Sequence, residues 1–113
     1  MTSKVSLLTL TVIATAAITA ERFITTAGAV ATAAGNADGV SNTDAAIGER
    51  FPADVLGTTI VTAGAAIAAN AYVEVGSAGK AITRASGKAV GKALQAATAD
   101  GDRIRVLLLP NGP

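Results

Sequence analysis

Apolar and polar residues alternate with a period of two near the start of the chain. The positions between the apolar residues are mainly Thr, which is common in strands. Such alternation predicts a half-buried strand, so we expect residues 1–17 to form an extended N-terminal arm or strand. The apolar side of the alternation is Leu8, Leu10, Val12, Ala14, Ala16 and Ile18.

The same segment has a second interpretation. Lys4 precedes an uncharged run, Val5–Ala20, that ends in small residues, as a secretory signal peptide does. The absence of a positive cluster beyond Lys4 and the recurring Thr count against it. A secreted or surface β-domain with residues 1–20 as its signal peptide is therefore the alternative. The run is also short for a membrane span.

From Ile18 onward the chain consists of short β-like runs separated by Gly, Asn and Asp. Turn signals every 8–12 residues predict an all-β fold, a small barrel or sandwich of short strands with at most one short helix. We expect one β-rich domain over residues 18–113. The candidate strands in its first half are Arg22–Thr26, Ala29–Ala33, Ala37–Ala46, Glu49–Leu56, which would end at Gly57, and Thr58–Thr62.

The second half of the domain echoes the first. Gly48-Glu49-Arg50-Phe51 and Gly101-Asp102-Arg103-Ile104 both read as Gly, acid, Arg and an apolar residue. Ile67–Val75 corresponds in the same way to Ile18–Thr26. We therefore predict an internal duplication of a four-strand unit, with repeats at residues 18–57 and 67–109. The last strand should turn Ile104, Val106 and Leu108 toward a core.

A basic stretch lies in the second repeat, with no acidic residue between Lys80 and Asp100. Its residues are spaced four apart, which would also suit one face of a helix. Gly87 and Gly91 inside the stretch disfavour a helix, although Ala93–Ala99 could form a turn or two. The basic residues are Lys80, Arg84, Lys88 and Lys92.

Composition limits the chemistry that the protein can perform. The chain has neither Cys nor His, so thiol nucleophiles, Ser-His-Asp triads and ordinary zinc sites are excluded. Asp100-Gly101-Asp102 could touch calcium but lacks the other ligands of a calcium loop. The phosphate-loop pattern is met neither by Gly76–Lys80 nor by Gly87-Lys88. We expect no enzyme and no cofactor. A net charge of +1, without aromatic residues in the basic stretch, argues against direct nucleic-acid binding.

Several segments resemble a family of small tailed-phage proteins, the capsid decoration or cement proteins. They are Ala17–Phe23, Thr43–Glu49, Asp54–Gly57, Val90–Leu94 and Gly101–Leu108, so the resemblance spans about Ala17 to Leu109. It implies a β-rich protein on the exterior of the expanded capsid, where it stabilises the head against internal pressure. The implied partners are the major capsid protein and further copies of the chain, as a homotrimer, with no membrane. The implied location is the virion, and the host cytoplasm during assembly.

Two hypotheses concern the contacts. The N-terminal arm would be loose in solution and add as an edge strand to the capsid or to a neighbouring protomer. The basic stretch would face acidic capsid surface, so that binding weakens with salt. The expected contact residues are Thr2, Lys4, Val5, Leu7 and Thr9 in the arm and Lys80, Arg84, Lys88 and Lys92 in the basic stretch.

Overall fold

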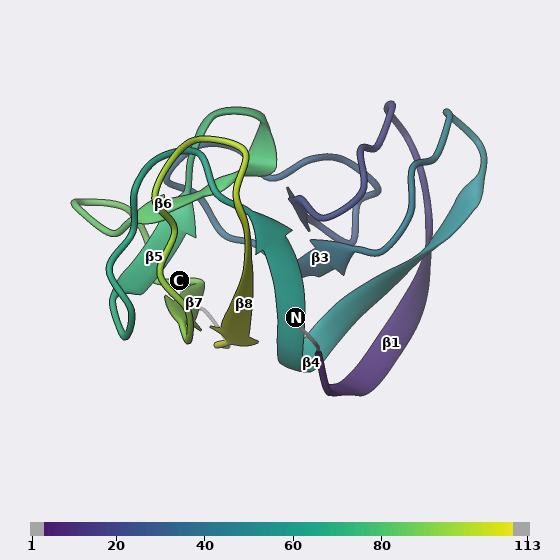
Figure 1. Ribbon diagram of the computed structural model, residues 1–113. Helices are drawn as coiled ribbons and strands as arrows, with labels where there is room; N and C mark the ends of the chain where they lie inside the picture. Colours follow the sequence, from purple (N-terminus) through teal and green to yellow (C-terminus); the bar gives the residue numbers. More distant parts are fainter. Residues whose placement is uncertain (1–3, 110–113) are drawn as a thin grey trace.

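A computed structural model describes residues 4–109 and shows an antiparallel, all-β protein (Figure 1). The all-β prediction is therefore confirmed. One short 3-10 turn, η1 (Ser77–Gly79), interrupts the strands in the described part of the chain. The strands are β1 (Ser6–Ile13), β2 (Phe23–Ile24), β3 (Gly39–Ser41), β4 (Arg50–Thr62), β5 (Tyr72–Val75), β6 (Ala81–Thr83), β7 (Gly91–Ala93) and β8 (Arg103–Leu108).

The strands form one sheet that curls into a nearly closed barrel. Their order is β2-β3-β4-β8-β7-β5-β6, and β1 pairs with the N-terminal part of β4. A bridge between Ala63, just after β4, and Ala81 in β6 brings the far end of the sheet back toward its middle. We call β1, β2, β3 and the N-terminal part of β4 the first lobe, and the C-terminal part of β4 with β5–β8 the second lobe. The long strand β4 passes from one lobe to the other (Figure 1).

The expected break at Gly57 is wrong, because β4 runs without interruption from Arg50 to Thr62. Gly57 has φ +97°, a left-handed conformation that glycine adopts at little cost, so the strand bends there and continues.

Ala29–Ala33 contributes only one bridge, from Val30 to Ile24, instead of a strand. The helical alternative for the basic stretch is also wrong, since β6 and β7 lie within it and residues 94–99 form bends and one bridge, from Ala97 to Ile67.

Two apolar clusters fill the two lobes, and their members correspond. Seven residues make up the first cluster, and the second contains a counterpart of each of them 49–53 positions later, such as Val61 for Val12 and Ile104 for Phe51. The expected burial of Ile104, Val106 and Leu108 is confirmed. The first cluster is Val12, Ala14, Ile18, Ile24, Ala45, Phe51 and Ala53; the counterparts in the second are Val61, Ala63, Ile67, Val73, Ala97, Ile104 and Val106.

Backbone hydrogen bonds recur at the same offsets. Ile18 and Ala45 exchange two bonds, as do Ile67 and Ala97. Gly48 donates to the Ala14 carbonyl, and its counterpart Gly101 donates to that of Ala63. This correspondence supports the proposed duplication. It also adds a strand to the start of each predicted repeat, namely β1 in the first and the C-terminal part of β4 in the second.

We predict that Gly57→Ala destabilises the fold more than Gly48→Ala. Both glycines have positive φ, at +97° and +89°, so alanine pays a conformational cost of about 1–2 kcal/mol at either position. A Cβ on Gly57 would also lie 2.4 Å from the Val5 carbonyl oxygen, whereas a Cβ on Gly48 meets nothing within 4 Å. Urea denaturation of both variants measures the difference. Equal losses would show that the crossing of β1 over Gly57 is not tightly packed.

Candidate functional site

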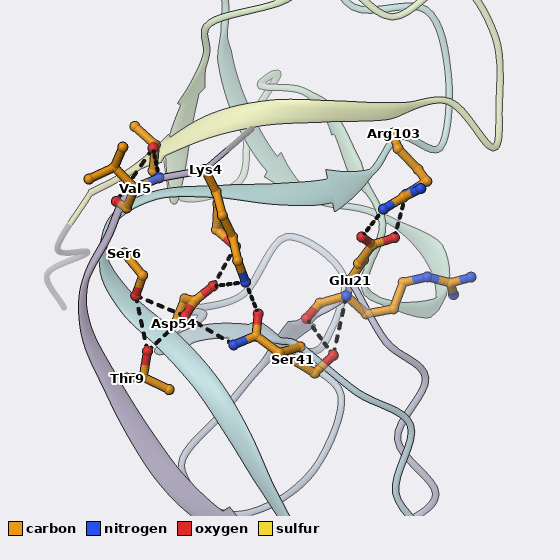
Figure 2. Close-up of polar contacts among 12 residues, drawn as sticks. Lys4, Val5, Ser6, Thr9, Glu21, Ser41, Asp54 and Arg103 are labelled. Atoms are coloured by element: carbon orange, nitrogen blue, oxygen red, sulfur yellow. Dashed lines mark hydrogen bonds and ion pairs between the residues drawn. The ribbon is translucent and has the colours of Figure 1, made fainter. Parts of the chain in front are cut away.

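Asp54 of β4 is a buried carboxylate, only 1% exposed, on which several strands converge (Figure 2). The residues that donate to it come from the start of the chain, from the residue after β3 and from β4 beyond the bend. Its two oxygens therefore tie the N-terminal segment to both lobes. The donors are Lys4 Nζ (2.8 Å), Ser6 Oγ (2.9 Å), Thr9 Oγ1 (2.9 Å), Asn42 Nδ2 (3.1 Å) and Thr59 Oγ1 (2.8 Å).

The donors keep Asp54 ionised. Burial by itself would raise the pKa of the Asp54 carboxyl. The hydrogen bonds from Lys4, Asn42, Thr59 and Ser6 outweigh that effect and hold the pKa well below its usual value. A negative charge is therefore built into the junction between β1 and β4. The sequence offered no signal for this role, because Asp54 stands in a strand as one of eight scattered carboxylates.

The strand that this network holds is apolar and exposed. Val5 is 65% exposed and Leu7 70%, and Leu8 and Leu10 are also exposed. The expected half-buried face is therefore wrong for Leu8, Leu10 and Ala16, while it is confirmed for Val12, Ala14 and Ile18. The pairing of β1 with β4 is irregular on both sides of Leu8 and regular from Thr9 to Ile13, so the buried part of the alternation begins only at Val12.

The N-terminal segment is also not a loose arm over its described residues. Ser6–Ile13 pairs with β4, and the main chain of Val5 exchanges hydrogen bonds with Thr58. Of the expected contact residues in this segment, Val5 and Leu7 point outward, whereas the side chains of Lys4 and Thr9 contact Asp54. The remaining expected residue, Thr2, lies outside the described residues.

The structure distributes the basic stretch over several places. Lys80 follows η1 and forms an ion pair with Asp100 at 3.0 Å. Lys92 of β7 stands 5.9 Å from the centre of the Tyr72 ring, a cation–π contact between paired strands. The Arg84 Nε donates to the Gly87 carbonyl, and the Lys88 main chain donates to that of Ala34. The side chains of Lys80, Arg84 and Lys92 therefore make contacts within the protein.

A buried glutamate organises the loop after β6. Glu74, which is 5% exposed, accepts hydrogen bonds from the main-chain N–H groups of Ala85 and Gly87. These bonds, that of Ala85 first, lower the pKa of the Glu74 carboxyl. A Cβ on Gly87 would lie 2.7 Å from the Glu74 carboxylate, which explains why glycine occupies the position. The Gly87-Lys88 pair is therefore part of a loop fixed by Glu74.

The Asp100-Gly101-Asp102 segment is the turn before β8. The Asp102 carboxylate accepts from the Thr98 main chain and hydroxyl and from the Ala99 main chain. Over residues 4–109 there is no group of three or more acidic residues that could hold a metal ion. The same residues contain no helix of the length and apolarity that a bilayer crossing needs.

Fold and site together define a small antiparallel β-protein with a fixed, exposed apolar strand. The family follows from comparison with known proteins. The family model of the phage cement proteins matches residues 3–108, so this chain belongs to the phage cement protein family. The resemblance noted in the sequence is thereby confirmed, and the chain is a phage structural protein by family.

A solved structure has the same fold. The N base of the head fiber gp8.5 of bacteriophage phi29 is similar with a TM-score of 0.72 and 19% sequence identity. The match covers 90% of this chain and 93% of that one, so the whole domain corresponds. No curated relative matches the sequence.

We predict that Asp54→Asn destabilises the protein by about 2–4 kcal/mol, because five donors lose their charged acceptor at a buried position. Asp100→Asn is the matched control, since Asp100 also accepts from a lysine but is exposed, and such pairs contribute about 0–1 kcal/mol. Urea denaturation of the two variants measures both values. Similar losses would contradict a special role for the Asp54 network.

Stability should also depend on pH through Asp54. The folded-state pKa lies below the unfolded value of about 3.9, so the network contributes fully above about pH 5. That contribution is lost as the pH falls through about 4 and below. Because Asn does not titrate, Asp54→Asn should show a smaller loss of unfolding free energy between about pH 5 and pH 3 than the unaltered protein. Parallel pH profiles would refute this assignment.

Proposed function

We propose that this protein binds the outer surface of the phage capsid and stabilises the expanded head against internal pressure. Its partner is the major capsid protein, and its location is the capsid exterior, reached from the host cytoplasm during assembly. Membership of the cement protein family and the likeness to a head fiber base support a place on the head. The observation that carries the proposal is the exposed apolar start of the chain, which the Asp54 network holds in place.

The geometry of β1 suits docking. Among the described residues it pairs with β4 alone, so its other edge offers main-chain donors and acceptors to a further strand. Its exposed side chains are uncharged and include the large apolar residues Leu7, Leu8, Leu10 and Ile13, as in the centre of protein interfaces. Because β1 is already ordered, binding does not have to pay for fixing a flexible arm.

We further propose that the protein acts as a homotrimer. A thin core rich in alanine, together with large apolar side chains left exposed, leaves apolar surface for neighbouring copies to cover. Closed cyclic symmetry is the usual way to satisfy such a surface. A ring of copies would also multiply the contacts that each protomer makes with the capsid.

The secreted alternative fits the structure poorly. Cleavage after residue 20 would remove β1 and three residues of the first apolar cluster, Val12, Ala14 and Ile18. It would also remove Lys4, Ser6 and Thr9, three of the five donors to Asp54. A buried carboxylate without those partners is strongly destabilising.

We predict saturable binding of the protein to emptied, expanded capsids, in a fixed ratio to the capsid lattice. Leu7→Ser should weaken this binding about tenfold or more, because a central apolar anchor is lost. Ile47→Ser is the control, since Ile47 is equally exposed, at 72%, but lies in the turn before β4. Co-sedimentation measures both variants. An unaltered protein that never binds would refute the function, and equal affinities of the two variants would refute the role of β1.

A further inference from the structure

The duplicated architecture places the same cross-strand row of residues in both lobes. In the first lobe the row is Phe23, Val40, Asp54 and Thr9, read across β2, β3, β4 and β1. In the second lobe the row is Tyr72, Lys92, Leu107 and Thr58, read across β5, β7, β8 and β4. Each member of the second row stands 49–53 positions after its counterpart, and the strand pairings are the same.

The two rows differ in what covers them. Phe23 and Val40 are fully buried and belong to the apolar cluster of the second lobe, and Asp54 is 1% exposed. Three of the four members of the first row therefore pack inside the molecule, and only Thr9 at its end is exposed. In the second row Tyr72 is 52% exposed, and Lys92, Leu107 and Thr58 are partly exposed. The second lobe thus repeats the packing surface and leaves it open.

The open row continues on both sides as apolar surface. Beside it lies a second outward row, made of Leu94, Arg105 and Ile60. Arg105 pairs with Ile60, and the Leu94 main chain donates to that of Arg105. At its β4 end, the Val5 main chain is hydrogen-bonded to Thr58, so the exposed start of the chain extends the same face. We call these two rows with Val5 the outer face.

Charge on the outer face has one sign. It carries Lys92 and Arg105, and none of the described Asp or Glu residues belongs to it. The acidic groups on or beside its strands are already engaged, and Asp54 of β4 accepts from its five donors. Glu74 of β5 is buried under its loop, and Glu21 forms a two-bonded ion pair with Arg103 at the start of β8 (Figure 2).

We propose that the outer face docks an apolar patch flanked by carboxylates on the major capsid protein. This inference rests on the proposed function and assigns the surface and the chemistry of its partner. Leu107, Ile60 and Val5 supply the apolar contact area, and Tyr72 adds an aromatic anchor of the kind enriched at interfaces. Lys92 and Arg105 select for acidic groups, since charge complementarity supports specificity and the rate of association.

The test compares two charge reversals in co-sedimentation with emptied, expanded capsids. The double variant Lys92→Glu/Arg105→Glu should bind at least about tenfold more weakly at about 0.1 M salt, and the difference should shrink as salt screens the charges. Arg50→Glu is the matched control, because Arg50 is exposed at the other end of β4, opposite Ile13. Urea denaturation checks that all variants are folded.

The outcomes separate this inference from the function on which it rests. If the unaltered protein does not bind capsids, the proposed function fails. If it binds and the double variant binds equally well, the function stands and the outer face is wrong. Sedimentation equilibrium of the free protein gives a third result, because a double variant with an altered oligomeric state would show that a second copy occupies the face, which overturns the capsid assignment.

Discussion

A buried carboxylate that needs five donors is the constraint on which the rest of this structure depends. Asp54 can stay ionised below the surface only while its donors remain in place, and these come from segments far apart in the sequence. The start of the chain supplies three of them. The fold therefore has to keep β1 against β4, although most side chains of β1 are exposed. The cost of an unpaired buried charge thus fixes an apolar strand at the molecular surface.

Within the proposed function, this arrangement separates the residues that anchor β1 from those that contact the partner. Ser6 and Thr9 turn toward Asp54, whereas the neighbouring Leu7 faces solvent. A loose arm with the same residues would lose conformational freedom on binding, which costs about 1–2 kcal/mol for each residue that becomes ordered. Here that cost is met during folding. Exposed apolar side chains can then contribute their burial to association instead of to ordering.

Local patterns were enough to predict the fold class but not the site. Period-two alternation and regular turns identified an all-β chain, and the Gly-acid-Arg echo suggested the repeat that the hydrogen bonds support. The sequence could not show that β4 continues through Gly57, because a glycine reads equally as a turn and as a bend. Asp54 was missed because its partners lie up to 50 positions away. Pairing across such distances is set by topology, which the spacing of one residue type does not encode.

The two lobes differ at one pair of corresponding positions. Asp54 and Leu107 occupy equivalent positions, each opposite a Thr on a neighbouring strand. In the first lobe the N-terminal segment covers this position, and the charged carboxylate of Asp54 accepts hydrogen bonds from that segment. In the second lobe no described segment covers the position to the same extent, and an apolar residue with basic neighbours stands there instead. The second lobe therefore keeps the cross-strand arrangement of the first but leaves it accessible to solvent. Tyr72 and Lys92 combine an apolar body with a polar end that stays hydrated, and a protein surface can bury their apolar parts together with Leu107.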